Sequence, residues 1–317
     1  MTDTPTTNGK KKLDIQKEAI CLSLKLGMLR TRRKVEAGAI ETDADRSLLH
    51  VGKEILESAE LKAVDQFRSD IKKYLRGRCL PSPFRSGVYL IRLALVEECM
   101  QFLTAAEATD KANIETFMTY YEQMYEKRHD LSNPMSQRLG SLYKAEDYPE
   151  PKKVRQTFQF EVQLWELSTP GALRTIDRAL YEREAAKMQN VWQEAKDSIK
   201  QVLLTEFREM TARMAERLTV PPDGKPKVFR DSLVGNLQEW LDLFEKRDLA
   251  DDEELKQLVN QARAMVSGIK PETIRDSDTL RQEIAQEMQS ITSKLDQAIV
   301  ERPGRKIELD EPEQVAS

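Results

Sequence analysis

The residue types that carry most enzyme chemistry are sparse in this sequence. It contains two histidines, His50 and His129, and three widely separated cysteines, Cys21, Cys79 and Cys99. Most zinc sites draw three or four ligands from such side chains at short spacing, which these residues do not offer. Neither a glycine-rich phosphate loop nor a nucleophile elbow occurs in the sequence. The sequence therefore predicts a non-catalytic protein that holds no metal and no cofactor.

Two clusters of cationic side chains are the best candidates for a binding site. The first consists of Arg30, Arg32, Arg33 and Lys34, and the second of Arg76, Arg78 and Arg85. Guanidinium groups form bidentate bonds to phosphate and carboxylate, and counterion release favours binding to nucleic acid. Three interpretations stay open: a solvated edge that balances acidic helices, a contact for an acidic partner protein, and a phosphate-binding surface.

The charge is unevenly distributed along the chain. Residues 1–34 contain nine Lys or Arg against three Asp or Glu, whereas the whole chain of 317 residues carries a net charge of −4. This balance excludes a strongly basic protein but permits a local basic patch. The odd number of cysteines, without a C-x-x-C pair, argues against a secreted disulfide framework and favours the cytoplasm.

The longest helical pattern covers residues 172–220, which contain no Gly and no Pro. Thr169 fits the N-cap position and Pro170 the first helical position. Apolar residues then recur every three or four positions, which predicts one helix about 70 Å long. Such a helix cannot bury its apolar stripe alone, so other helices of this chain or of a partner must cover it.

Further helices are predicted on either side of this long helix, since 33% of the residues are charged and glycines and prolines are few. They cover residues 42–75, 86–108, 110–127, 229–244, 251–269 and 276–300. The helix from residue 86 is apolar on most sides, which suggests the centre of a bundle. A membrane span there is disfavoured because Arg92, Glu97 and Glu98 interrupt it.

Two segments alternate between apolar and polar residues, a pattern with the period of a β-strand. They cover residues 19–26 and 157–165, and the second contains Phe158, Phe160, Val162 and Leu164 on one face. A lone strand would leave its backbone groups unpaired, so we expect these two strands to pair with each other.

The fold class predicted is mostly α, an elongated bundle of long antiparallel helices with a small two-stranded β element and a C-terminal three-helix bundle. The expected domains are a disordered lead at residues 1–12, an elongated helical domain at 13–220 and a small helical bundle at 225–300. A polar disordered tail is expected at 301–317.

Several short motifs carry a resemblance to a known family. They read VFRDSL at residues 228–233, LADDEEL at 249–255, LR at 280–281, LKLG at 24–27 and RRK at 32–34. In these motifs the chain, from about residue 13 to 300, resembles a bacterial family of unknown function found in phages, plasmids and integrative elements. That family is typically encoded beside MoxR-type or cobalt-chelatase-like AAA+ ATPases and von Willebrand A-type proteins. It has no established catalytic residues to carry over.

The resemblance implies a scaffold or adaptor that binds an AAA+ ATPase, and the long helices also permit a homo-oligomer. A nucleic-acid-binding accessory factor that uses the arginine clusters is the alternative. A helical pore-former is a further alternative, with residues 86–103 as its only candidate membrane segment.

Overall fold

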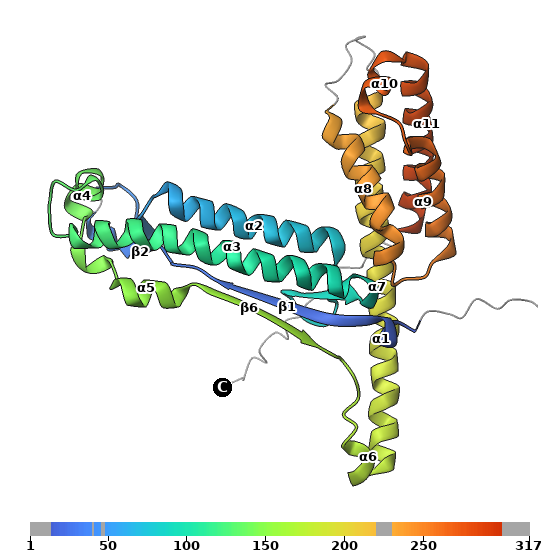
Figure 1. Ribbon diagram of the computed structural model, residues 1–317, viewed down its shortest axis with the longest axis horizontal. Coiled ribbons are helices and arrows are strands. Elements are labelled where there is room, and N and C mark those ends of the chain that lie inside the picture. The colour runs from blue at the N-terminus through green and yellow to red at the C-terminus, as the bar shows by residue number, and fades with distance from the viewer. Residues whose placement is uncertain (1–13, 40, 46–47, 220–229, 300–317) are drawn as a thin grey trace, which may run out of the picture. The chain divides into compact units, whose positions relative to one another are not determined.

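The structure, a computed structural model, describes residues 14–39, 41–45, 48–219 and 230–299 (Figure 1). The chain divides into two compact units, Met1–Trp192 and Gln193–Ser317. Helices account for most of the described residues, so the protein is mostly α, as the sequence predicts. The expected lead at residues 1–12 and tail at 301–317 lie outside the described residues.

An antiparallel sheet with the strand order β4-β5-β1-β6 lies in the N-terminal unit. Its strands are β1 (Ala19–Gly27), β4 (Leu80–Pro81), β5 (Val88–Arg92) and β6 (Gln159–Trp165). The predicted strands are β1 and β6, and their pairing is confirmed: it runs from Cys21 opposite Trp165 to Gly27 opposite Gln159. The sheet has four strands and is therefore larger than the expected two-stranded element. The short helix α1 (Ile15–Glu18) precedes β1.

Residues 88–92 form β5, so the prediction that a helix begins at residue 86 is wrong. Val88, Tyr89 and Ile91 are β-branched or aromatic and favour extended backbone. A central strand such as β1 has backbone N–H and C=O groups on both edges that need partners. β6 pairs with one edge of β1, and β5 pairs with the other. The helix that follows, α3, begins at Leu93.

The first long helix, α2 (Ala59–Arg78), begins later than the predicted start at residue 42. The Ser58 hydroxyl caps it by accepting the Leu61 N–H at 3.1 Å. Upstream, β2 (Arg32–Val35) pairs with β3 (Val51–Glu54) in a separate two-stranded sheet, and a short 3-10 helix, η1 (Ala37–Ala39), follows β2.

The helix α3 (Leu93–Glu126) is continuous, although the sequence predicts two helices that meet near Asp110. Asp110 is not an N-cap: it lies inside the helix, buried against Arg68 of α2. Figure 1 shows α2 and α3 side by side, next to β1 and β6. The apolar core between these helices and the sheet consists of Leu22, Ile71, Leu75, Cys79, Ile91, Leu95, Cys99, Leu103 and Ala106.

A second apolar cluster lies where α3 ends. Here the chain forms α4 (Pro134–Leu139), two 3-10 turns, η3 (Gly140–Leu142) and η4 (Ala145–Asp147), and α5 (Pro151–Thr157). Aromatic and Met side chains of α3 fill this cluster together with residues from the segments around it. Its buried members include Ile55, Leu56, Phe117, Met118, Tyr121, Tyr148 and Val154.

The predicted single helix over residues 172–220 is two helices, α6 (Leu173–Ile176) and α7 (Arg178–Leu218). Asp177 separates them: its carboxylate accepts the N–H groups of Ala179 and Leu180 at 2.8 and 3.2 Å and so caps α7. Near the unit boundary, the buried Trp192 ring meets Phe84 edge-on at 4.8 Å and donates to the Leu167 carbonyl at 3.3 Å.

In the described part of the C-terminal unit, four more helices follow the second half of α7. They are α8 (Asp231–Arg247), α9 (Glu253–Val266), α10 (Pro271–Asp276) and α11 (Asp278–Ala298). Phe207 of α7 stacks on Trp240 of α8 with ring centroids 4.9 Å apart. The unit boundary therefore falls inside α7 and not between residues 220 and 225 as the sequence predicts. Phe229 and Val300, the expected helix ends, lie outside the described residues.

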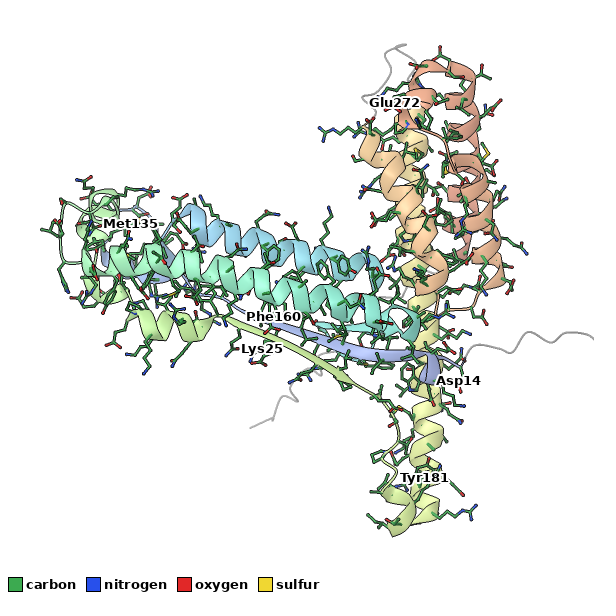
Figure 2. The ribbon with its side chains drawn as sticks, viewed as in Figure 1. Asp14, Lys25, Met135, Phe160, Tyr181 and Glu272 are labelled. Atoms are coloured by element: carbon green, nitrogen blue, oxygen red, sulfur yellow. The ribbon has the colours of Figure 1, made fainter. Side chains whose placement is uncertain are left out.

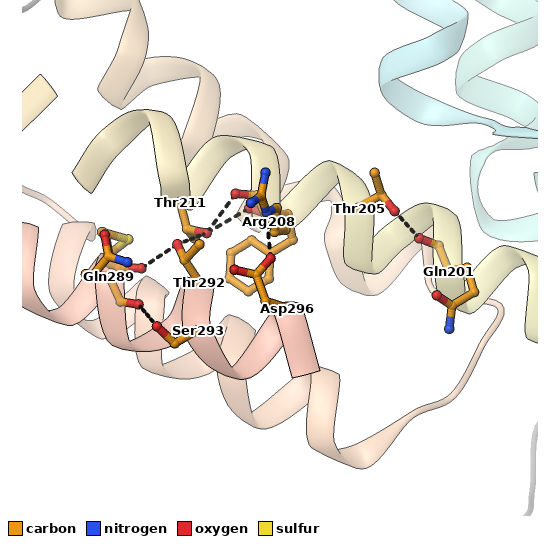
Figure 3. Close-up of polar contacts among 10 residues, drawn as sticks. Gln201, Thr205, Arg208, Thr211, Gln289, Thr292, Ser293 and Asp296 are labelled. Atoms are coloured by element: carbon orange, nitrogen blue, oxygen red, sulfur yellow. Dashed lines mark hydrogen bonds and ion pairs between the residues drawn. The ribbon is translucent and has the colours of Figure 1, made fainter. Parts of the chain in front are cut away.

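Two helices that are distant in sequence, α7 and α11, are joined by polar side chains (Figure 3). The Thr292 hydroxyl donates to the Thr211 hydroxyl oxygen at 2.9 Å, and both residues are buried. One turn away, Arg208 forms an ion pair with Asp296 at 2.8 Å. Each of these hydroxyls also bonds a backbone carbonyl of its own helix, so the threonine pair adds one polar contact between α7 and α11.

Within the described ranges, none of the helices has the length and apolar character that a membrane crossing requires. The candidate membrane segment at residues 86–103 is divided between β5 and α3.

Candidate partner-binding surface

The first predicted cluster of cations lies on the small sheet formed by β2 and β3. We use the name cationic ribbon for this sheet together with residues 30–34, which precede and begin β2. Arg30, Arg32 and Lys34 are exposed, whereas Val35 is buried at the end of β2. Across the ribbon, Arg32 lies opposite Glu54 and Lys34 opposite Gly52. Three cationic side chains therefore reach solvent from one short segment.

Contacts at its base hold the cationic ribbon against the rest of the N-terminal unit. The Ile55 N–H donates to the Thr31 carbonyl at 2.9 Å. Lys53 is buried and forms an ion pair with Asp147 and a hydrogen bond to the Leu142 carbonyl. These bonds fix the backbone from which the exposed cations project.

Arg33 has a structural role that its sequence context does not reveal. Its guanidinium donates to the carbonyl oxygens of Arg30 and Arg32, at 2.6 and 3.4 Å. These bonds stabilise the segment before β2 from within. Of the four predicted residues in this cluster, Arg30, Arg32 and Lys34 are therefore the ones offered to a ligand.

Gly52 lets the Arg32 side chain lie close to the β3 backbone. A Cβ atom at this position would come within 2.5 Å of Arg32 Nε. Because Gly52 has no side chain, the Arg32 side chain can cross the ribbon next to the β3 backbone.

The second predicted cluster lies at the opposite end of α2. Arg76 and Arg78 are in its last turn, and Arg85 is exposed in the turn between β4 and β5. Arg78 donates to Glu98 at 2.8 Å and its guanidinium lies 3.9 Å from the centre of the Tyr74 ring. Since α2 is about 30 Å long, the two clusters do not form one site.

A deeply buried ion pair in the N-terminal unit joins Arg68 of α2 to Asp110 of α3, and the sequence patterns do not predict it. Arg68 Nε donates to Asp110 Oδ1 at 2.8 Å and Nη2 donates to Oδ2 at 2.7 Å, with side chains 3% and 1% exposed. The same guanidinium donates to the carbonyls of Gly27 and Gln159. The sequence feature that could have indicated this ion pair is a charged residue, Arg68, within the apolar stripe of α2.

The cysteines and histidines of the chain differ in their burial. Cys21, Cys79 and Cys99 are buried, and burial raises the pKa of the Cys21 thiol to about 11. His50 and His129 are exposed, near β3 and the end of α3. Across the part of the chain that the structure describes, three or more His, Cys, Asp or Glu side chains nowhere gather as metal ligands would.

Several tyrosines lie in the apolar cluster that also contains Leu29 and Ile55, the residues that flank the cationic ribbon. Tyr121 donates to the Pro149 carbonyl at 2.7 Å and Tyr143 to the Arg128 carbonyl at 2.6 Å. Burial raises the pKa of both Tyr121 and Tyr148, so these phenols are neutral at physiological pH. These tyrosines therefore contribute to the packing of the cluster that adjoins the ribbon.

No protein-family model, curated protein or solved structure significantly matches this chain. Its function is therefore inferred from its own geometry and from the resemblance noted in its sequence.

Proposed function

We propose that the protein is a non-catalytic helical scaffold or adaptor that binds an acidic segment of a partner protein through the cationic ribbon. The observation that carries this proposal is the exposure of Arg30, Arg32 and Lys34 on a backbone fixed by buried contacts. A backbone that is already fixed loses little conformational freedom on binding, and guanidinium groups pair well with carboxylates.

The sequence resemblance suggests which partner to test. It implies an AAA+ ATPase of the MoxR type, in the cytoplasm of a bacterium or in a mobile-element system. In this proposal the long helices form an elongated bundle that serves as a stiff arm, and the C-terminal unit, Gln193–Ser317, is a second helical body. The buried ion pair of Arg68 and Asp110 supports a stiff N-terminal unit, since it connects two helices and two strands.

The test uses purified full-length protein and the MoxR-type ATPase encoded beside it, where the host supplies one. We expect the triple variant Arg30→Glu, Arg32→Glu, Lys34→Glu to lose binding at least tenfold. A matched control changes three exposed helical cations, Lys72, Lys73 and Lys111, to Glu and should bind like the wild type. Loss of binding in both variants would show that total charge matters and the ribbon does not.

The nucleic-acid alternative is tested in the same experiment. Labelled single- and double-stranded oligonucleotides are titrated with both variants at several salt concentrations. Tight oligonucleotide binding with a steep salt dependence, flattened only by the ribbon substitutions and without ATPase binding, would contradict the adaptor proposal.

A further inference from the structure

The outer strand of the four-stranded sheet, β6, has one edge without a strand partner among the described residues. On that edge the backbone N–H and C=O groups of alternate residues point away from β1. Natural edge strands are commonly protected by Pro, Lys or a bulge. Residues 159–165 contain no Pro and no Lys, and their pairing with β1 is continuous. This edge is therefore suited to accept another strand.

A groove runs beside this edge, between β6 and α3. It has a volume of about 450 Å³ and is lined by Met100, Leu103, Thr104 and Glu107 of α3 and by residues 160–163 of β6. Phe160, labelled in Figure 2, and Val162 pack against the core on this side of the sheet. Leu164, the next residue of the same face, is 38% exposed. A strand added to β6 would place its own apolar side chains along the groove.

The sequence of β6 is complementary to itself in antiparallel orientation. Residues 160–164 read FEVQL, so apolar and polar positions alternate symmetrically about Val162. Two copies centred on Val162 would place Phe160 opposite Leu164 and Glu161 opposite Gln163. A pairing centred on Glu161 would instead oppose two carboxylates, which is unfavourable.

The only charged residue of this strand is already balanced within its own chain. Lys25 of β1 donates to the Glu161 carboxylate at 3.3 Å on the face of the sheet away from Phe160 and Val162. Two copies could therefore approach without a net repulsion between their β6 strands.

We propose that a second copy of this chain docks on β6, antiparallel and centred on Val162, to form a continuous eight-stranded sheet. The cationic ribbon belongs to a different sheet. Self-association through β6 is thus independent of the partner binding proposed above, and either can fail while the other holds.

The first test measures mass by sedimentation velocity over a range of concentrations. The wild type should reach twice the chain mass of 36.5 kDa. Gln163→Glu places carboxylates opposite Glu161 of the second copy, and Gln163→Lys places an ammonium there. The pair of residues 161 and 163 occurs twice in the symmetric dimer, so each substitution changes two cross-strand contacts. The dissociation constants of the Gln163→Glu and Gln163→Lys dimers should therefore differ roughly tenfold, with the Glu variant the weaker. Gln163 is exposed, so neither change should affect folding. Gln156→Glu, in α5, is the charge-matched control.

The second test fixes the register by disulfide formation under a copper catalyst in air. Val162→Cys should give a covalent dimer, because its two copies lie opposite each other at the two-fold axis. Leu164→Cys should not, since it lies opposite Phe160. The three native cysteines are buried and serve as the wild-type control.

Several outcomes would overturn the proposal. One is a monomer at every concentration, including for Gln163→Lys. Another is a dimer that Gln163→Glu does not weaken and Val162→Cys does not crosslink, which would place the interface elsewhere, for example on α7. A monomer whose β6 amides are protected from hydrogen exchange would show that the chain covers its own edge. Protection that appears only with the partner protein would assign the edge to a partner strand.

Discussion

The Arg68 guanidinium illustrates how a single buried charge determines local architecture. It bonds the Asp110 carboxylate with two nitrogens and also donates to the ends of β1 and β6, at the carbonyls of Gly27 and Gln159. A buried ion pair is tolerated only when such additional bonds satisfy its polar atoms. The pair therefore specifies the relative placement of α2, α3 and the sheet.

Removing one member of this pair should be strongly destabilising. Asp110→Ala leaves the guanidinium buried without its anion, so we expect the free energy of unfolding to fall by about 3–5 kcal/mol. Urea denaturation followed by circular dichroism measures this loss. Asp65→Ala, on the exposed side of α2, is the control and should change stability little. An equal loss in both variants would contradict the assigned role of the pair.

At the residue scale, the sequence identified the exposed cations but not the buried ones. Arg30, Arg32 and Lys34 are exposed as a polar cluster suggests, whereas Arg33 bonds backbone carbonyls. Asp110 stands at the start of the helix predicted over residues 110–127, a position that Asp favours, but it lies inside α3. Its true partner, Arg68, is 42 positions away, and pattern analysis of single helices cannot detect such a distant pair.

Gly27, the last residue of β1, is placed where only glycine fits. A Cβ atom there would collide with the Thr157 carbonyl oxygen. Gly27→Ala should therefore separate β1 from the start of β6 and lower stability by about 1–3 kcal/mol. Thermal unfolding checks this against Gly77→Ala, in α2, where the space around the Cβ position is open. That control should stabilise the helix by up to about 1 kcal/mol.

The helix α9 depends on Asp252 in a manner that pH should reveal. Burial alone would raise the pKa of Asp252, but hydrogen bonds from Lys200 and from the Leu255 N–H outweigh burial and lower it. A carboxyl group whose pKa is lowered on folding stabilises the native state above its ordinary pKa of 3.8. This contribution is lost as the pH falls through the native pKa.

Asp252→Asn keeps the cap but removes the charge. We expect it to lower stability by about 1 kcal/mol at neutral pH, and the difference from the wild type should vanish in acid, below the native pKa. Unfolding by urea at a series of pH values measures the difference. A difference that is constant with pH would contradict the ionic contribution.

At the element scale, the patterns succeeded where a segment is long or strictly alternating. The pairing of β1 with β6 follows from their apolar alternation, and α9 and α11 lie close to their predicted ranges. The strand β5 was missed because its five residues run directly into α3, so one apolar stretch contains both. The strand ends and the helix begins after Arg92 because residues 88–92 pair with β1, and no local sequence pattern encodes that pairing.

The largest difference from expectation concerns the whole molecule, where the unit boundary falls at Trp192–Gln193. The sequence placed it after α7 because Pro and Gly interrupt the chain there. Instead, the second half of α7 supplies Phe207 against Trp240 and Glu206 against Arg247 of α8. A continuous helix thus belongs to two cores, which composition alone cannot show.

Two fragments distinguish these boundaries. The fragment 193–317 retains the Phe207 and Glu206 partners of α8 and should unfold cooperatively. The fragment 225–317 lacks them, so Trp240 would lose its stacking partner and become exposed. We expect this shorter fragment to show a red-shifted tryptophan emission and no cooperative transition. Cooperative unfolding of the shorter fragment would instead support the boundary predicted from the sequence.

The order of the strands has a consequence for how the protein is made. Lys25 and Glu161, which join β1 to β6, are 136 positions apart, whereas Arg263 and Glu245 in the C-terminal unit are 18 apart. Distant contacts form slowly. During synthesis β5 becomes available to pair with β1 before β6 does. A nascent chain that is arrested after β5 and before β6 therefore carries the apolar strand β1 with one unpaired edge. Such a chain should be sensitive to protease and dependent on chaperones until residue 165 leaves the ribosome.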